Sequence, residues 1–348
     1  MRHPLIRPPA LEPGDTIGIF TPSSPAHVRF REKYLHGISQ LEALGFRVVE
    51  GPLTAAQTHQ GYRSGSPEER AAEFMALILD PEIKALISTI GGDNSASMIP
   101  YLDFAAIRAH PKVICGYSDV TSLHLAILAY SGLSTFYGPA VMPSSGEWPE
   151  MLSGTRDSFL DAVHRHRSGS RRLQPPLRWS DQFRDAGASA WKEEPRRFEP
   201  NPGWRALAPG QASAAVVVAN LATLCRNAGT PHFPELAGTI LLVEEMDAPL
   251  AREEAGLRQL QLMGVFDELA GLIIGKPESF SAQGASFGYD DLVLEIVGER
   301  PYPIVSNFDC GHTHPMLTLA QMTRISLTTT DAHEVSVTVE EPMVVAQR

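Results

Sequence analysis

The stretch VICGYSDVTSLHLAI, residues 113–127, joins a short apolar run to a helical pattern through a glycine and a serine. Residues 113–116 predict a buried strand, and residues 121–130 predict a helix. The glycine permits a sharp turn, so Ser118 stands just beyond a strand and just before a helix. This order is typical of a nucleophile elbow, in which the serine hydroxyl stands clear of the sheet. Because Val120 breaks the usual G-x-S-x-G pattern, a Ser-Asp helix cap explains the same residues, and both interpretations stay open at this point.

Strands and helices alternate before and after this stretch. One helix has a clear start, because Ser66 can cap it, Pro67 suits its first position and Glu69 completes a capping box. Strands that alternate with helices through short loops predict a parallel sheet covered on both faces. The expected strands are residues 16–20, 47–49, 85–90, 113–116 and 133–137, and the expected helices are residues 30–44, 66–79 and 121–130.

A change of composition near residue 143 divides the chain. Residues 143–210 are rich in Pro, Arg, Ser and Trp, which predicts a helix near residues 155–164 and then an irregular connector or flap. We therefore expect an N-terminal α/β domain at residues 1–143, a connector with a substrate flap at 144–210, and a C-terminal domain at 211–348. In the C-terminal part the expected strands are residues 214–218, 239–243, 272–275 and 304–307 with strand-like alternation at 326–344, and the expected helices are residues 257–262 and 290–297.

The composition indicates a folded protein whose partner is a small molecule. Hydrophobic residues make up 43% of the 348 residues, which is enough for two α/β domains with real interiors. The formal net charge of −11 repels phosphate backbones and anionic lipid, so we expect neither nucleic acid nor membrane as a partner. The charge is compatible with a small-molecule or peptide substrate, whose own charge would be met locally.

Cysteine usage and the first residues predict the compartment. The three cysteines, Cys115, Cys225 and Cys310, form neither an even set nor a C-x-x-C pair, so we expect no disulfide framework and no zinc ribbon. The first residues contain no apolar segment of the kind that a signal peptide needs. These features together predict a protein of the reducing cytoplasm.

A serine nucleophile needs a base, and one histidine stands in a suitable place. His312, in the stretch CGHTHP, follows the expected strand 304–307, and loops after parallel strands lie where α/β proteins bind ligands. An exposed loop histidine is the plainer interpretation of the same residue. His312 and His314 could also bind a metal with Asp309, but a third ligand at helical spacing is missing, so we expect no metal and no cofactor.

The base needs an acidic partner that orients it. Glu244 and Glu245 end the expected strand 239–243, and neighbours on a strand point in opposite directions, so only one of them can face the histidine. Solvated charges at the end of a strand are the alternative. The pair Gly91-Gly92 could bring a backbone N–H to an oxyanion, or it could form only a tight turn.

Nine blocks of sequence are spread in order from Gly14 to Leu319: GDTIGIFTPSSPA, RSGSPEERAAEF, STIGGDNSASMIPYLDF, ICGYSDVTSLHLAI, TFYGPAVMPSSGE, ANLATL, ILLVEE, GVFDELAGLIIGK and DCGHTHPMLTL. Through these blocks the chain resembles the LD-carboxypeptidase family of serine peptidases and, within it, the microcin C immunity peptidase branch. The resemblance implies an N-terminal flavodoxin-like parallel-sheet domain and a C-terminal β-rich α/β domain, with the site between them and often in a homodimer.

The resemblance also implies roles for individual residues. By position in the blocks, Ser118 matches the nucleophile, Glu244 the acid and His312 the base of a catalytic triad. Gly92 and Asp119 match the residues whose backbone N–H groups form the oxyanion hole. The expected enzyme is therefore a serine carboxypeptidase or amidase that forms an acyl-enzyme and needs no cofactor.

The resemblance leaves the substrate open. Asn220 matches an asparagine near the substrate, and the segment with Trp179 and Trp191 resembles an aromatic substrate loop. Members that hydrolyse processed microcin carry a basic residue four places after the acid, where this chain has Ala248, so a phosphate contact from that position is absent. We expect hydrolysis of a peptidyl or aminoacyl amide, such as an aminoacyl-nucleotide. The alternatives are a murein L,D-carboxypeptidase that removes terminal D-Ala and a non-catalytic ligand-binding protein.

Overall fold

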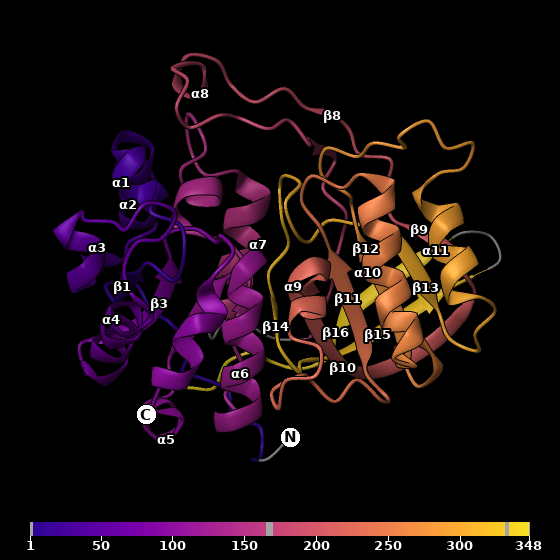
Figure 1. Cartoon of the computed structure of the whole chain (residues 1–348), viewed down its shortest axis with the longest axis horizontal. Coiled ribbons are helices and arrows are strands. Elements are labelled where there is room, and N and C mark those ends of the chain that lie inside the picture. Colours follow the sequence, from indigo (N-terminus) through magenta and orange to yellow (C-terminus); the bar gives the residue numbers. More distant parts are fainter. Residues whose placement is uncertain (1–2, 165–169, 331–333, 348) are drawn as a thin grey trace.

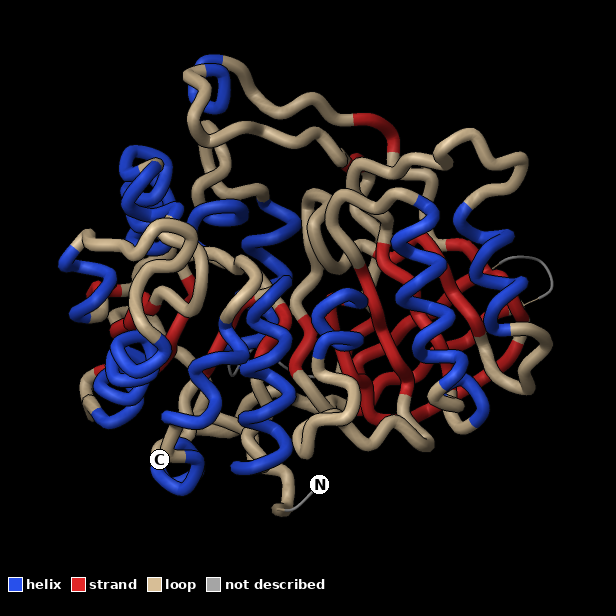
Figure 2. The backbone as a smooth tube through the Cα atoms, viewed as in Figure 1, coloured by secondary structure: helices blue, strands red, loops and turns tan. Residues whose placement is uncertain are grey.

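Two sheets, each covered by helices, lie side by side in the computed structural model, which describes residues 3–164, 170–330 and 334–347 (Figure 1, Figure 2). The sheet of the N-terminal part is mostly parallel, and the C-terminal part builds a second, larger sheet. The α/β class expected from the sequence, with a parallel-sheet N-terminal domain and a second sheet in the C-terminal domain, is confirmed. Among the described residues, no helix has the length and apolar character that a membrane span needs.

Six strands form the N-terminal sheet, in the order β14 (Leu319–Ala320), β5 (Phe136–Tyr137), β4 (Val113–Gly116), β3 (Ile83–Ser88), β1 (Thr16–Phe20) and β2 (Arg47–Glu50). All residues of β1 and β4 are buried, as expected for continuous apolar runs in a sheet covered on both faces. The strands β1 to β5 pair in parallel, whereas β14 pairs antiparallel with β5. The segment after the C-terminal sheet's last parallel strand therefore returns to the N-terminal sheet.

The helices of this part are α1 (Ala26–Arg29), α2 (Arg31–Ala43), α3 (Pro52–Ala56), α4 (Pro67–Leu79), α5 (Phe104–Ala109), α6 (Thr121–Ser131) and α7 (Ser153–Val163). The predicted start of α4 is confirmed, because Ser66 Oγ accepts from the backbone N–H of Glu69 at 3.1 Å and the Glu69 carboxylate accepts from Ser66 N at 2.7 Å. Side chains on the two faces of β1 enter different buried clusters, with Ile17 and Ile19 in one and Phe20 in the other. Helices pack on both faces for this reason.

Eight strands form the second sheet, in the order β6 (Arg171–Arg172), β16 (Val335–Val339), β15 (Arg324–Thr329), β10 (Gly210–Asn220), β11 (Ile240–Glu244), β12 (Gly271–Gly275), β13 (Ile304–Phe308) and β9 (Arg205–Ala208). The strands β10 to β13 pair in parallel, and the outer strands pair antiparallel. The register sets Asn220 beside Glu244 at the carboxyl ends of β10 and β11. The helices here are α9 (Leu221–Arg226), α10 (Leu250–Leu262) and α11 (Tyr289–Val297).

The connector between the two sheets arches over both of them (Figure 1). Within it, β7 (Arg178–Trp179) pairs with β8 (Glu199–Pro200), and one helical turn, α8 (Ala190–Glu193), lies between them. The sequence does not predict these elements or the strands β6 and β9, because each has only two to four residues and none is a continuous apolar run. The three-part division at residues 143 and 210 stays a prediction.

Hydrogen bonds between α6 and the residues on either side of α9 join the two halves near the turn that carries Ser118. Thr121 Oγ1 accepts from the backbone N–H of Asn220 at 3.1 Å, and Ser122 Oγ accepts from Asn227 Nδ2 at 2.9 Å. The Gln321 side chain binds both the N–H and the carbonyl of Val218. The start of α6 is thereby held beside the ends of β10 and β11.

Candidate active site

Ser118 occupies a strained turn between β4 and α6. Its φ is 63°, a left-handed conformation that costs a non-glycine residue about 1–3 kcal/mol. The N-cap residue of α6 is Val120, which provides no capping side chain, so Ser118 is not the cap of this helix. A Cβ built on Gly91 would lie 3.2 Å from Ser118 Oγ, so a side chain at position 91 would crowd the hydroxyl. The geometry favours the nucleophile elbow over the helix cap.

A buried histidine, His124, forms hydrogen bonds that hold the end of β4 in front of this turn. His124 Nε2 lies 3.0 Å from the carbonyl oxygen of Gly116, and Nδ1 lies 2.8 Å from Thr135 Oγ1. Burial lowers the pKa of His124 to about 4, so the ring is neutral and donates from Nε2 to the carbonyl while Nδ1 accepts from the hydroxyl. This histidine therefore has a structural role.

Glu244 and His312 form a tight pair at the end of β11. The two atoms His312 Nδ1 and Glu244 Oε2 lie 2.7 Å apart, and the same oxygen accepts from the backbone N–H of His312 at 3.1 Å. The Glu244 side chain is fully buried. The carboxylate therefore fixes both the ring and the loop that carries it.

Two further groups hold the other oxygen of this carboxylate. Tyr137 donates its hydroxyl hydrogen to Glu244 Oε1 and accepts from the backbone N–H of Ser118 at 3.1 Å. Asn220 Nδ2 lies 3.3 Å from the same oxygen. Tyr137 thus links the Ser118 backbone directly to the Glu244 carboxylate. Sequence reasoning missed it, although its block TFYGPA places it at the end of the strand beside the elbow.

Glu245 points away from the histidine. Its carboxylate accepts from the backbone N–H of Ala222 at 2.8 Å, at the start of α9, and from Asn220 Nδ2 at 3.0 Å. Neighbours on a strand diverge in this way. The two glutamates therefore have separate partners and share only the Asn220 amide.

The charges around His312 set its proton affinity. Burial lowers the pKa of His312, but the charge and hydrogen bond of Glu244, helped by Glu245 and Glu278, outweigh it and raise the pKa above its ordinary value of 6.5. Burial, together with Arg196, Lys33 and His312, holds the pKa of His314 well below the ordinary value. The pKa values of these two histidines are therefore shifted in opposite directions, and His312 binds a proton more readily than His314.

Ser118 and His312 line one pocket of about 310 Å³. Gly91-Gly92 form part of its wall, and a Cβ on Gly91 would lie 3.3 Å from the backbone nitrogen of Asp119. The Asp119 carboxylate accepts from the backbone N–H groups of residues 94 and 95 at 3.0 and 2.9 Å, which ties the glycine loop to the elbow. The flap contributes Gln182, Phe183, Arg184 and Arg196 to the lining of the pocket.

The comparison with known families agrees with this geometry. Residues 17–138 match the family model described as the LD-carboxypeptidase N-terminal domain, and residues 213–327 match the LD-carboxypeptidase C-terminal domain. The chain belongs to the LD-carboxypeptidase family. It is a hydrolase, and as a member of this family it is a serine peptidase.

Similarity to individual proteins extends over nearly the whole chain. The sequence is 40% identical over 322 residues to the microcin C7 self-immunity protein MccF of Escherichia coli, and the match covers 91% of each chain. It is 29% identical over 313 residues to a Bacillus subtilis protein named probable murein peptide carboxypeptidase, covering 89% of this chain and 88% of the relative. A solved structure of MccF in complex with aspartyl sulfamoyl adenosine matches with a TM-score of 0.91 and 36% identity, covering 98% of this chain and 100% of that chain. The family expected from the sequence is confirmed.

Three residues that the family resemblance assigns to the substrate lie outside the pocket wall of this LD-carboxypeptidase. Asn220 is buried, and its amide binds Glu244 and Glu245. Trp191 is buried against Trp148, with ring centroids 6.2 Å apart. Their contacts with a substrate, and that of Trp179, stay predictions.

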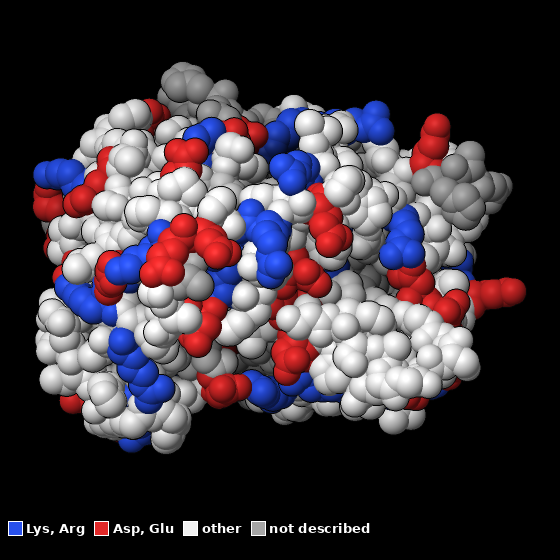
Figure 3. All heavy atoms as spheres, turned by 90° about the horizontal axis from the view of Figure 1, so that it is seen from above, with Lys and Arg blue, Asp and Glu red and all other residues white. Residues whose placement is uncertain are grey.

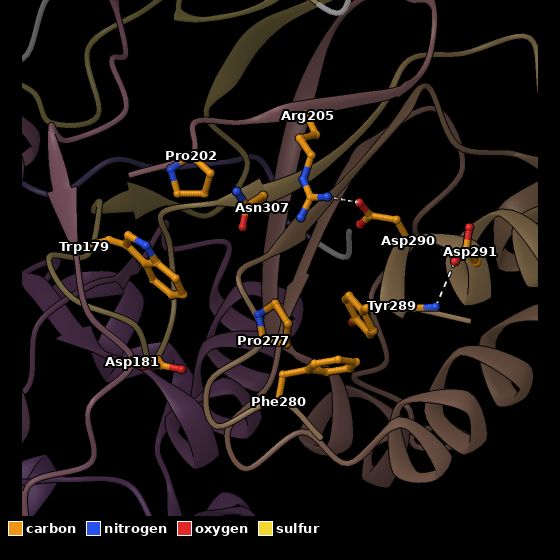
Figure 4. Close-up of a pocket in the computed structure, with 11 residues that line it drawn as sticks. Trp179, Asp181, Pro202, Arg205, Pro277, Phe280, Tyr289, Asp290, Asp291 and Asn307 are labelled. Atoms are coloured by element: carbon orange, nitrogen blue, oxygen red, sulfur yellow. Dashed lines mark hydrogen bonds and ion pairs between the residues drawn. The ribbon is translucent and has the colours of Figure 1, made fainter. Parts of the chain in front are cut away.

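Trp179 lines a different hollow of about 520 Å³ on the C-terminal sheet (Figure 4). Its ring points across this hollow toward Pro277, and Phe280 and Tyr289 form the far wall. The flap residues from Trp179 to Arg184 therefore run between the two hollows.

The atoms of the alternative metal set have other partners. Asp309 is buried, forms an ion pair with Lys276 and accepts from Trp204 Nε1 at 2.9 Å. His312 Nδ1 binds Glu244. In the described parts of the chain, no group of three or more His, Cys, Asp or Glu side chains could hold a metal ion.

Proposed function

We propose that this serine peptidase uses Ser118, His312 and Glu244 as a catalytic triad to hydrolyse an amide bond. The observation that supports this most strongly is the 2.7 Å contact between His312 Nδ1 and Glu244 Oε2. A ring that donates from Nδ1 to a carboxylate keeps Nε2 free as the basic nitrogen, which is the tautomer that a general base needs.

The reaction follows from these roles. Ser118 Oγ attacks the carbonyl carbon and gives its proton to His312 Nε2, and Glu244 stabilises the imidazolium. The backbone N–H groups of Gly92 and Asp119 are proposed to stabilise the oxyanion, which the close approach of the Gly91-Gly92 loop to Ser118 supports. The C–N bond then breaks, the leaving amine takes the proton from His312, and water releases the acyl-enzyme by the same steps.

The proposed substrate carries a peptidyl or aminoacyl amide bond, as an aminoacyl-nucleotide does. Structural similarity to MccF, which was solved with aspartyl sulfamoyl adenosine and glutamyl sulfamoyl guanosine, supports this choice. Asn220, Trp179 and Trp191 are the proposed substrate contacts, and they require a rearrangement both of the flap and of the buried Asn220 amide. The second candidate is removal of terminal D-Ala from murein tetrapeptides, which the relative named as a murein peptide carboxypeptidase supports.

The experiment compares Ser118→Ala and His312→Ala with wild type on an aminoacyl sulfamoyl-adenosine and on an L,D-tetrapeptide. Each variant should lower kcat by at least about 10³-fold with unchanged circular dichroism, because a triad acts as a unit. His110→Ala, at an exposed histidine, is the matched control. Near-native turnover by either triad variant would reject that residue, and binding without turnover by wild type would support the non-catalytic alternative.

We also propose that the enzyme works as a homodimer in the cytoplasm, with the three parts divided near residues 143 and 210. Basic and acidic side chains are interspersed on the face that carries the flap (Figure 3), which suits a small substrate better than a nucleic acid. Sedimentation equilibrium tests the assembly, and a single-chain mass at micromolar concentration would reject the dimer.

A further inference from the structure

Among the residues that the structure describes, none accepts a hydrogen bond from the Lys33 ammonium group in the wall of the Ser118 pocket. Lys33 lies on α2, lines this pocket and is only 7% exposed. Within the described residues its nitrogen makes no hydrogen bond or ion pair, and the ring of Trp191 lies 5.7 Å from it. A buried ammonium without an acceptor is unfavourable, so the site is incomplete until an anion enters.

The charges near Lys33 leave an excess of positive charge. Arg184 and Arg196 share the buried carboxylate of Glu147, at 2.5 and 2.8 Å. Three cations therefore lie near two buried carboxylates, Glu147 and Glu278, and Asp185 is exposed. Burial lowers the pKa of Lys33 to about 8, and Glu147 offsets only part of this effect. The ammonium is charged at neutral pH but not neutralised.

The geometry favours a carboxylate over a phosphate. The fork of Arg196 is already used by Glu147 and by the carbonyl of Gln182, so it offers no bidentate site for a phosphate. A lone ammonium with three donors suits one carboxylate. Glu278, which is 6% exposed and lines the same pocket, would repel a dianion more than a single charge.

We propose that Lys33 is a specificity-determining residue that binds a carboxylate of the substrate beside Ser118, an inference that rests on the proposed peptidase function. Two sources offer this chemistry. One is the C-terminal carboxylate of a leaving D-amino acid, and the other is the acidic side chain of an aminoacyl group.

The test uses two matched pairs of substrates. One pair is an L,D-tetrapeptide ending in D-Ala and the same peptide as its C-terminal amide, and the other is aspartyl and asparaginyl sulfamoyl-adenosine. Values of kcat/KM are measured for wild type, Lys33→Met and Lys33→Gln, and dissociation constants are measured in the Ser118→Ala background. Lys112→Met is the control, because Lys112 is equally buried at 7% exposed but donates to the carbonyls of Leu77 and Asp80.

Both Lys33 variants should lower kcat/KM and affinity by about 10- to 100-fold for the carboxylate member of one pair, and change its neutral member by less than about threefold. The affected pair identifies the source of the carboxylate. The proposal is overturned if the Lys33 variants lose equally on the charged and the neutral member of each pair, or lose nothing on any compound. It is also overturned if Lys112→Met shows the same charge-selective loss, or if none of the four compounds binds. Wild type could bind the carboxylate member of a pair more tightly than the neutral member and still hydrolyse none of the four compounds. In that case the proposed peptidase function is rejected and the proposed carboxylate site at Lys33 is retained.

Discussion

Replacing Glu244 by glutamine tests the proposed role of its negative charge, because the two side chains have nearly the same volume. The carboxylate accepts from four donors: His312 Nδ1 and the His312 backbone N–H on one oxygen, and Tyr137 and Asn220 on the other. A glutamine amide has only one oxygen. If its NH₂ group faces the ring, His312 must accept at Nδ1 and carry its proton on Nε2, so it cannot act as the base. If its oxygen faces the ring, the negative charge that stabilises the imidazolium is still lost.

We expect Glu244→Gln to lower kcat by about 10⁴-fold, the loss found when another triad exchanged its acid for the amide. KM should change little, because Glu244 does not line the pocket. The acid limb of the pH profile of kcat/KM should also shift to lower pH, because His312 then loses the largest of the charges that oppose the effect of burial on its pKa.

Glu245→Gln is the matched control. Glu245 binds the start of α9 and the Asn220 amide, not the histidine, so its kcat should fall by less than about tenfold. Steady-state kinetics on one substrate, with thermal unfolding of both variants, provide the comparison. A larger loss of kcat in Glu245→Gln than in Glu244→Gln would refute the assignment of the acid.

Four further outcomes are expected. Tyr137→Phe should lower kcat by about 10- to 100-fold with KM nearly unchanged, since it removes one hydrogen bond to a charged acid; a change confined to KM would contradict this role. Wild-type kcat/KM should rise with pH as His312 loses its proton, with a midpoint above 6.5, and a midpoint below 6.5 would argue against His312 as the base. Glu147→Gln should lower the unfolding free energy by about 3–5 kcal/mol in urea titrations, because two buried arginines lose their carboxylate, whereas the exposed Glu150→Gln should not. EDTA should leave kcat unchanged, and a loss that zinc restores would favour the His312–His314 metal alternative.

The strands that carry the site could be predicted because they are buried on both sides. In β1 and β4 every residue is apolar or small and a turn signal follows, so the sequence patterns locate their ends. By contrast, β14 contributes two residues to a sheet whose other strands lie far away along the chain. Its pairing depends on tertiary contacts, which no local pattern reveals.

The buried cluster around Glu147 was hidden for a related reason. Glu147, Arg184 and Arg196 lie in a segment of irregular composition, where charged residues usually indicate solvent exposure. These side chains become buried only because the flap folds back and brings both arginines against Glu147. The same folding places Lys33, an ordinary helical lysine in the sequence, in the wall of the pocket.

The sequence contains a signal that distinguishes Glu244 from Glu245 as the partner of His312. Alternation along β11 says that the two side chains diverge, but not which one meets His312. Two glycines carry the missing information. A Cβ on Gly275 would lie 2.6 Å from Glu244 Cβ, and a Cβ on Gly311 would overlap the Glu244 carboxylate. The acid therefore fits only because both of its neighbours lack side chains, and the glycine directly before His312 is the signal in the sequence that a large group must pass beside this loop.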